Sequence, residues 1–493
     1  MDGQLPILQV VLPLMMAPVT LILRNPRAAW MLTLVVTWAT FTISLSLLMQ
    51  VLDSGTIIYK IGGWAAPWGI EYVLDKVGAF VMVIVSGIGS IVLTYSRRSV
   101  EMEVPEDRIY LFYTMFLLCL TGLMGIVITG DVFNLFVFLE ISSLSSYVLI
   151  SLGKDRRALT AAFRYLIMGT IGATFYIIGV GLMYMMTGTL NMADLSALIP
   201  AVADTRTIQA ALAFLTVGIC LKLALFPLHL WLPNAYTYAP SVVTAFLAST
   251  ATKVAVYVLI RIVFTVFGGV GVMEGLGVQH ILMALALTAM FAASTIAIYQ
   301  NNVKRLFAYS SVAQIGYIIL GLSFVSESGV AAGIIHLFNH AIMKCAIFMG
   351  LGCVVLRIGG VTIKDMHGLG HRMPWTMGAI VLGGLSLIGI PMTVGFVSKW
   401  YLVRAALEKD MWFIAVLIVL SSLLAVIYVW RIVEAAYLKP VPENAAPVHE
   451  APISMLLPLW VMALASIYFG LDATNTLSIA LDAANALLHG GVL

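Results

Sequence analysis

Long hydrophobic stretches follow one another along almost the whole chain, and the polar stretches between them are too short for a soluble domain. Each hydrophobic stretch has the length of about 20 residues that an α-helix needs to cross the hydrocarbon core of a membrane. The pattern predicts an all-α polytopic membrane protein with about 14 membrane-spanning helices. The expected spans are residues 5–23, 29–52, 77–95, 110–128, 131–152, 161–187, 208–230, 240–267, 278–299, 306–325, 330–356, 376–406, 411–437 and 452–471.

Lysine and arginine residues are distributed unevenly between the two sets of loops that these spans create. Because cytoplasmic loops hold the excess of positive charge in membrane proteins, the richer set is expected to face the cytoplasm. The distribution predicts a multi-pass protein of the cell membrane with both termini outside the cytoplasm. The richer set carries Arg24, Arg27, Arg97, Arg98, Lys154, Arg156, Arg157, Lys304, Arg305, Arg357, Lys364, Arg372, Arg431 and Lys439, whereas the other carries Lys60, Lys76, Arg206 and Lys409.

The composition agrees with a membrane protein and narrows the chemistry. The 493 residues are 61% hydrophobic and 10% charged, whereas soluble domains are about 25% charged. The net charge of +3 is small and spread over the loops, so nothing indicates nucleic-acid binding. The four cysteines lie in expected spans without CxxC spacing, and the chain lacks a glycine-rich nucleotide loop. We expect no cofactor and no metal, and the remaining chemistry is ion movement.

Two of the expected spans contain a helix break close to a lysine. The seventh span reads Lys222-Leu-Ala-Leu-Phe-Pro227, and the twelfth reads Gly389-Ile-Pro391 with Lys399 shortly after it. Proline removes an amide donor and frees carbonyl groups, so each break predicts a hydrated site within the membrane. The breaks are five spans apart, and a shift by an odd number of helices reverses direction. This predicts two inverted five-helix repeats, spans 4 to 8 and spans 9 to 13.

The repeats divide the chain into four parts. Residues 1–109 hold the first three helices, and residues 110–267 and 278–437 hold the two repeats, each expected to form a proton half-channel. Residues 438–493 hold the fourteenth helix and a tail. In this arrangement Lys222 and Lys399 are approximate counterparts, one in each half-channel.

Ionisable residues inside otherwise apolar spans form the candidate site. Each charge at the centre of a span costs roughly 2.5 to 3.5 kcal/mol, so a series of charges indicates that the function needs them. Glu140 is the only acidic residue central to a span, and a buried carboxylate needs a partner such as a lysine. Such a pair can act as a proton switch or serve only as a static ion pair between helices. The candidates are Glu140, Lys222, Lys253, His336, His340, Lys344 and Lys399.

The spacing of these residues indicates a proton relay. Lys253 follows several small hydroxyl residues that can line a wet path, and a desolvated lysine releases a proton where arginine would not. His336, His340 and Lys344 are four residues apart and share one helical face. Two histidines at this spacing can bind zinc, but no glutamate follows His336, so a hydrogen-bonded relay is favoured over a metal site. The structural alternatives are that the lysines only anchor the helices and that the histidines are core residues whose hydrogen bonds are satisfied.

Three motifs occur together in the chain. They are GDVFNLFVFLEISS at residues 130–143, LKLALFPLHLWLPNA at residues 221–235 and HLFNHAIMK at residues 336–344. The combination resembles the antiporter-like subunits shared by respiratory complex I and Mrp cation/proton antiporters, and the resemblance spans nearly the whole chain. Within that superfamily, the length and the first motif are most similar to the D-type subunits of Mrp Na⁺/H⁺ antiporters.

The resemblance implies roles for particular residues. Glu140 corresponds to the family's acid of the fifth helix, Lys222 to its partner in the broken seventh helix, Lys253 to the central lysine of the eighth helix, and Lys399 to the terminal residue of the twelfth. It also implies a hetero-oligomeric complex with other Mrp subunits, in which this chain moves H⁺ at the membrane midplane while the assembly exchanges Na⁺ or another monovalent cation. The alternative is a proton-pumping subunit of a redox complex, either complex I or a membrane-bound hydrogenase, whose motifs could be nearly identical.

Overall fold

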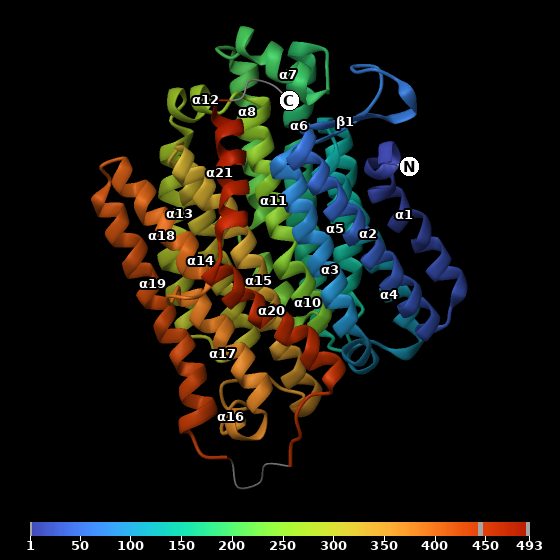
Figure 1. Ribbon diagram of the computed structural model, residues 1–493, viewed down its shortest axis with the longest axis vertical. Helices are drawn as coiled ribbons and strands as arrows, with labels where there is room; N and C mark the ends of the chain where they lie inside the picture. The colour runs from blue at the N-terminus through green and yellow to red at the C-terminus, as the bar shows by residue number, and fades with distance from the viewer. Residues whose placement is uncertain (1, 442–446, 490–493) are drawn as a thin grey trace.

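The computed structural model describes residues 2–441 and 447–489, and most of them lie in helices (Figure 1). Within these ranges, 13 helical segments are long and apolar enough to cross a membrane. The prediction of an all-α polytopic membrane protein is therefore confirmed. The uninterrupted helices that match expected spans are α1 (Leu5–Leu23), α2 (Pro26–Ser54), α3 (Lys76–Glu103), α4 (Ile109–Ile128), α5 (Val132–Ser151), α6 (Arg157–Thr187), α13 (Val278–Ile298), α14 (Val303–Ser323), α15 (Glu327–Ile358), α19 (Trp412–Val433) and α20 (Ile453–Leu471).

The seventh expected span is broken, as predicted, but its break comes earlier. Helix α8 (Arg206–Leu223) stops before Pro227, and the chain resumes as α9 (Trp231–Tyr238). Ala224, the residue after Leu223, takes a left-handed conformation with φ of 59°, and this ends the helix at Leu223. The indole of Trp231 donates to the carbonyl of Leu221 at 2.9 Å, so one of the freed carbonyl groups is satisfied by the second segment.

The eighth expected span is also interrupted, which was not predicted from the sequence. It consists of α10 (Ser241–Ser249), α11 (Ala251–Ile260) and a π-helical turn, η5 (Arg261–Val266). Thr250 separates the first two segments with φ of −124° and ψ of −59°, outside helical geometry. The interruption lies three residues before Lys253, and it frees carbonyl groups of α10 in the middle of the membrane.

The twelfth expected span is broken where the sequence predicted. Helix α17 (Pro374–Ile388) ends at Gly389, whose φ of +90° requires glycine, and α18 (Val394–Glu408) begins five residues later. Together α17 and α18 form the twelfth expected span, which no single long helix covers. Helix α20 covers the break, because Gly470 packs so closely that a Cβ atom there would lie 2.6 Å from the Cα atom of Thr393.

Some short elements differ from the expectation of helices joined by loops. Strands β1 (Ile57–Lys60) and β2 (Glu71–Leu74) form an antiparallel hairpin in which Ile57 pairs with Leu74. Three short helices lie between spans, namely α7 (Met192–Leu198), α12 (Val270–Gly275) and α16 (Leu369–Arg372). Beyond residue 471, where a tail was expected, the chain forms helix α21 (Thr474–His489). Helix α20 runs obliquely and α21 then runs upright toward the upper end in Figure 1, where it packs against α3 and α15.

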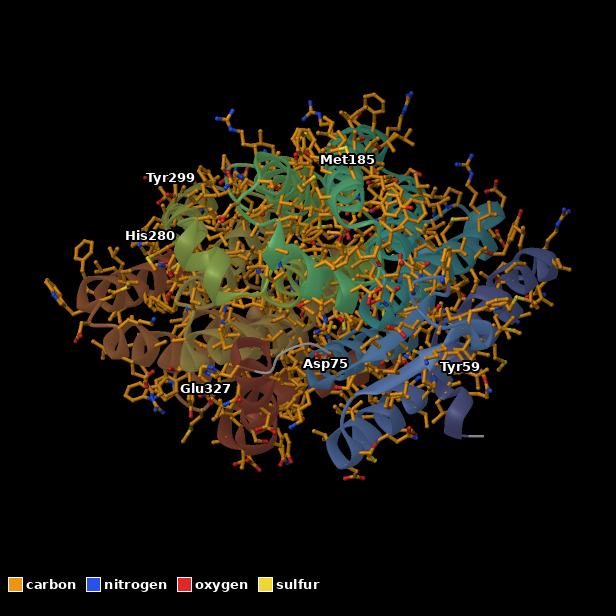
Figure 2. The ribbon with its side chains drawn as sticks, turned by 90° about the horizontal axis from the view of Figure 1, so that it is seen from above. Tyr59, Asp75, Met185, His280, Tyr299 and Glu327 are labelled. Atoms are coloured by element: carbon orange, nitrogen blue, oxygen red, sulfur yellow. The ribbon has the colours of Figure 1, made fainter. Side chains whose placement is uncertain are left out.

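The helices form an elongated bundle with α15 near its centre. Viewed along the helices, α1 and α2 lie at one end of the cross-section and α19 lies at the other (Figure 2). Helix α15 contacts α3, α10, α14, α17, α18, α20 and α21. The most apolar windows of α14 and of the 241–266 segment are 94% buried, compared with 33% for α1 and α2. The core of the bundle therefore lies where α10, α11, α14 and α15 meet.

The two ends of the bundle differ in charge. Helix α1 begins and α21 ends at the upper end in Figure 1, as an even number of crossings requires. The opposite end carries the loops around residues 24–27, 97–108, 153–157, 302–305 and 357–372, which hold half of the 26 lysine and arginine residues of the chain. We call this end the arginine-rich face.

Candidate functional site

Glu140 and Lys222 form an ion pair inside the bundle. Helix α5 presents Glu140, and the last turn of α8 presents Lys222, whose Nζ atom lies 3.2 Å from Oε1 of Glu140. Lys222 also donates to the hydroxyl of Ser143 at 2.7 Å. The Lys222 side chain is 7% exposed and that of Glu140 is 26% exposed. The expected pairing of these two residues is therefore present in the structure.

A small cavity lies beside Lys222 on the side of α11. It has a volume of about 20 Å³ and is lined by Ser143, Ser146 and Tyr165 on one side and by Ala251 and Val254 on the other. A cavity of this volume with several polar groups in its wall is large enough for one water molecule. The cavity thus lies between the ion pair and the face of α11 that carries Ala251 and Val254, and Lys253 itself is not part of its wall. Within the described residues, no direct hydrogen bond joins Lys222 to Lys253.

Lys253 occupies the interruption of the eighth span. Its ammonium donates to the carbonyl of Ala248, one of the groups freed at Thr250, and lies 3.4 Å from the hydroxyl of Thr252. The side chain is 1% exposed. In the described part of the chain it has no carboxylate partner, so its charge is held by neutral oxygen atoms alone. An ammonium in such surroundings can lose its proton without leaving a buried anion behind.

His336, His340 and Lys344 share one face of α15, as their spacing predicted, and all three are fully buried in the bundle. Lys344 donates to the carbonyl of Phe307 at 2.8 Å and to the hydroxyl of Ser310, both on α14. His340 is fully buried, and neither of its ring nitrogens has a partner among the described residues. The positive charges of Lys253 and Lys344 both act on His340. An imidazole whose two nitrogens are not engaged by other protein groups can accept a proton at one nitrogen and release it from the other.

His336 connects this face to the second break. Its Nδ1 atom lies 2.7 Å from the hydroxyl of Ser398, and its Nε2 atom lies 2.9 Å from the side-chain oxygen of Gln314. The rings of His336 and His340 are nearly parallel, with centroids 6.3 Å apart. His336 thus has the satisfied hydrogen bonds of a core histidine, whereas His340 does not have them among the described residues.

Lys399 reaches back from α18 to the end of α17. Its Nζ atom donates to the carbonyl groups of Leu387 at 2.8 Å and of Ile388 at 3.0 Å. It also lies 4.7 Å from the ring centre of Tyr317. The side chain is 7% exposed, so it does not extend toward the membrane surface. The break in the twelfth span therefore has its freed carbonyl groups satisfied by the lysine itself.

The lysines at the three interruptions all lie at the carboxyl end of a helix. Lys222 lies in the last turn of α8, while Lys253 and Lys399 cap the carboxyl ends of α10 and α17. The carboxyl end of a helix carries unpaired carbonyl groups and a partial negative charge, which stabilise a nearby cation. Each interruption thus provides a helix end that stabilises an ammonium group inside the bundle.

Several residues around the site were not predicted from the sequence. Ser143, Ser310, Gln314 and Ser398 supply the hydroxyl and amide partners of the lysines and histidines. Common polar residues at such positions give no separate signal in a single sequence. Their role becomes apparent only from the packing of α5, α14 and α18 against the lysine-bearing helices.

An additional ion pair lies toward the end opposite the arginine-rich face. Arg261 binds Asp75, the N-cap residue of α3, and donates through Nε to Tyr257 at 2.8 Å. Lys253, Tyr257 and Arg261 are spaced four residues apart along α11 and η5. The sequence gives no signal for this pair, because Asp75 stands at the start of an expected span and residues 261–266 have the composition of the end of an apolar span.

The described residues contain no group of three or more His, Cys, Asp or Glu side chains that could hold a metal ion. The cysteines are free and buried, and they lie at four separate positions. What the site contains is a series of buried or partly buried ionisable groups, from Glu140 and Lys222 through Lys253, His340 and Lys344 to His336 and Lys399.

Residues 129–425 of the sequence match the family described as NADH:quinone oxidoreductase/Mrp antiporter, TM. The chain is 40% identical to NADH-quinone oxidoreductase subunit N of Desulforudis audaxviator (strain MP104C), over 96% of each chain. It is 32% identical to the D subunit of the Na⁺/H⁺ antiporter of Bacillus subtilis (strain 168), over 90% of this chain and 88% of that one. The fold is similar to that of a chain in the Mrp complex from Dietzia sp. DQ12-45-1b, with a TM-score of 0.90 at 24% identity, covering 99% of this chain and 98% of that one.

Proposed function

The chain belongs to the family of membrane subunits shared by NADH:quinone oxidoreductases and Mrp antiporters, and we propose that it is the proton-translocating subunit of a multi-subunit monovalent cation/proton antiporter. The observation that carries this proposal is the arrangement of buried lysines at three helix interruptions, joined by the histidines of α15. Protons move between these groups along the membrane midplane. The two halves of the chain, residues 110–267 and 278–437, each provide one half-channel.

The Glu140–Lys222 pair gates this movement. While Glu140 is ionised, it holds the charge on Lys222 through the 3.2 Å ion pair. Separation of the pair, or protonation of Glu140, leaves the Lys222 ammonium in a low-dielectric site without a counter-ion. The ammonium then gives up its proton toward Lys253 through the adjoining cavity. The structural alternative is a static pair that only fastens α5 to α8.

The second half of the relay uses α15. Lys253 and Lys344 exchange protons through His340, whose ring nitrogens have no partner among the described residues and are free to do so. His336 and its partners Ser398 and Gln314 extend the relay to Lys399. Release at Lys399 completes the transfer on the side opposite to uptake.

The exchange partner is proposed to be Na⁺ or a related monovalent cation. The relatives include a protein named as the D subunit of a Na⁺/H⁺ antiporter, and that name places it within a larger assembly. Protonating a buried lysine changes the local field, so a cation in a neighbouring subunit is affected by the charge state of Lys222. We propose that the complex lies in the cell membrane, with the arginine-rich face toward the cytoplasm.

A second candidate function is proton pumping in a redox complex. It is favoured by the 40% identity to a protein named NADH-quinone oxidoreductase subunit N. The two candidates share the proton path and differ in what drives it. Purifying the assembled complex through a tag on this chain distinguishes them, because flavin or iron–sulfur subunits in the complex support the redox pump and small membrane subunits alone support the antiporter.

The proposal is tested in vesicles that contain the full complex. Adding a Na⁺ gradient produces a pH change across the membrane in the intact protein. Glu140→Ala and Lys222→Ala are each expected to abolish that change while the complex still assembles. Retained Na⁺-driven proton flux in an assembled Lys222→Ala complex would overturn the proposed role of the pair.

A further inference from the structure

A cavity on the arginine-rich face leads to a buried lysine that the proposed relay does not use. The cavity has a volume of about 400 Å³ and lies where the ends of α3, α9, α14 and α15 meet the loop between α5 and α6. Its rim contains exposed residues, among them Lys154, Arg157 and Thr362, whereas its floor contains Lys304, which is 4% exposed. The cavity thus connects the surface with a buried ammonium group.

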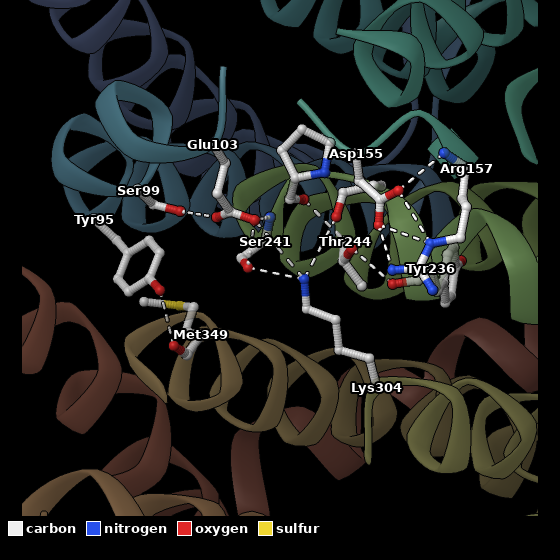
Figure 3. Close-up of polar contacts among 12 residues, drawn as sticks. Tyr95, Ser99, Glu103, Asp155, Arg157, Tyr236, Ser241, Thr244, Lys304 and Met349 are labelled. Atoms are coloured by element: carbon white, nitrogen blue, oxygen red, sulfur yellow. Dashed lines mark hydrogen bonds and ion pairs between the residues drawn. The ribbon is translucent and has the colours of Figure 1, made fainter. Parts of the chain in front are cut away.

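The floor of the cavity is a hydrogen-bonded cluster of Glu103, Lys304 and Ser241, whose side chains point toward one another (Figure 3). Lys304 donates to the hydroxyl of Ser241 at 2.9 Å, and its Nζ atom lies 4.0 Å from Oε2 of Glu103. The same carboxylate oxygen accepts from the backbone and the hydroxyl of Ser241, each at 3.0 Å. Its other oxygen accepts from Ser99 at 2.7 Å. We call this set the floor cluster.

The other charges at the cavity are held in separate contacts. Arg157 donates to Asp155 at the rim, and this hydrogen bond holds the pKa of that carboxyl below its ordinary value. Lys154 donates to the carbonyl of Met102 at 2.6 Å. Asp155 therefore stays ionised beside Arg157 and acts on Lys304 only at longer range, whereas Glu103 is the carboxylate within 4.0 Å of the Lys304 ammonium.

A row of polar groups continues inward from the floor cluster. Ser241, Thr244 and Ala248 lie on one face of α10, because they are three and then four residues apart. Thr244 donates to the carbonyl of Tyr236 at 2.9 Å, and the carbonyl of Ala248 holds the ammonium of Lys253. At 1.5 Å per residue, the distance along the helix from Ser241 to Ala248 is about 10 Å. Thr244 thus lies between the floor cluster and the carbonyl that holds Lys253 along this face of α10.

We propose that this cavity is the mouth through which protons from the arginine-rich face reach Lys253, and that the floor cluster loads them. The inference rests on the proposed function, since it names the first groups of that relay. Glu103 takes a proton from water in the cavity, which removes the negative charge beside Lys304. The Lys304 ammonium then releases a proton inward past Thr244 and becomes a neutral amine. The Glu103 carboxyl returns its proton to that amine, so one proton has moved inward and both groups are restored.

The experiment measures proton flux in vesicles holding the assembled complex, while the pH is varied only on the arginine-rich face. Glu103→Gln is expected to lower the flux at least tenfold and to remove its dependence on pH at that face. Glu103→Asp keeps a carboxylate and is expected to restore part of the flux. Glu101→Gln is the matched control, because it makes the same chemical change two residues away, at a carboxylate that pairs with the exposed Arg97 and Arg98. A structural role alone for Glu103 would lower the amount of complex without changing the pH profile.

A blocking experiment tests the cavity without touching the floor cluster. The native cysteines are buried, so a membrane-impermeant thiol reagent reacts with an introduced cysteine. A bulky reagent on Met102→Cys, in the cavity wall, is expected to stop flux from this face, whereas the same reagent on exposed Arg98→Cys is not. If Lys222→Ala abolishes proton flux but neither Glu103→Gln nor the reagent changes it, this inference is overturned and the proposed function stands. Flux that survives Lys222→Ala as well would overturn both.

Discussion

Lys222 lies 3.2 Å from Glu140 and belongs to the last turn of a half-helix that stops one residue later. The pair therefore combines two sources of stabilisation for the ammonium group, a carboxylate and the negative end of a helix. Neither Lys253 nor Lys399 has a carboxylate partner among the described residues, although both use a helix end. Of the lysines at the three interruptions, Lys222 is thus the one that has a carboxylate partner in the described part of the chain, and the proposed gating rests on this difference.

The first prediction concerns His340. Replacing it with leucine keeps an apolar side chain of similar length in a fully buried position and removes both ring nitrogens. We expect proton flux to fall about 100-fold, since a positioned proton-transfer group contributes factors of this order. Flux assays on assembled complexes provide the measurement. An unchanged rate in His340→Leu would show that protons pass from Lys253 to Lys344 without the imidazole.

The second prediction concerns the turn beside Lys399. Gly389 has φ of +90°, and a Cβ atom there would lie 3.0 Å from Cδ of Lys399. Gly389→Ala therefore strains the turn and displaces the lysine from the carbonyl groups it caps, and we expect proton flux to fall by about tenfold. Gly181→Ala is the control, because nothing in the described part of the chain lies within 4 Å of the added Cβ atom in α6. Equal flux in the two variants would contradict a role for the position of Lys399.

The third prediction concerns the stability contributed by Asp75 and Arg261. Removing the carboxylate with Asp75→Asn leaves a buried guanidinium without its counter-ion, and we expect a loss of about 3 kcal/mol in the free energy of unfolding. Asp482→Asn is the control, because Asp482 pairs with Lys76 at an exposed position where such bonds contribute little. Thermal unfolding of the two variants in detergent measures the difference.

The same pair predicts a dependence on pH. Burial alone would raise the pKa of Asp75, but Arg261 and the backbone amide of Gly78 outweigh it and hold that pKa below its ordinary value of 3.8. A depressed pKa contributes stability that is fully present above the unfolded value and is lost as the pH falls through the folded value. The stability difference between Asp75→Asn and the intact protein should therefore shrink below pH 3.8. A difference that stays constant down to about pH 2 would contradict an ionised Asp75.

The sequence predicted the features that depend on strong local signals. Hydrophobic length located the spans, and a charge within a span marked Glu140, Lys222, Lys253, Lys399 and the face of α15. Proline and glycine marked the two breaks. These signals can be recognised in the sequence because a membrane tolerates charges and irregular backbone only where protein or water forms hydrogen bonds or ion pairs with them.

Features that depend on tertiary packing were not predictable in the same way. The interruption at Thr250 has no proline or glycine, and it is maintained by contacts that place Lys253 on the carbonyl of Ala248. The floor cluster joins Glu103, Ser241 and Lys304 from three helices that are distant in the sequence. Glu103 and Lys304 each look like an ordinary loop-proximal charge until the fold brings α3, α10 and α14 together.

The proposed relay requires Lys222 to release a proton, and Lys222→Arg tests this requirement without removing the charge. Arginine can keep the ion pair with Glu140 and the position at the end of α8, but it stays protonated. In vesicles containing the assembled complex, we predict that Lys222→Arg assembles normally and shows no cation-driven or redox-driven proton flux. Proton flux at the intact level in Lys222→Arg would contradict the relay, because a permanent charge at this position could only serve as a structural anchor.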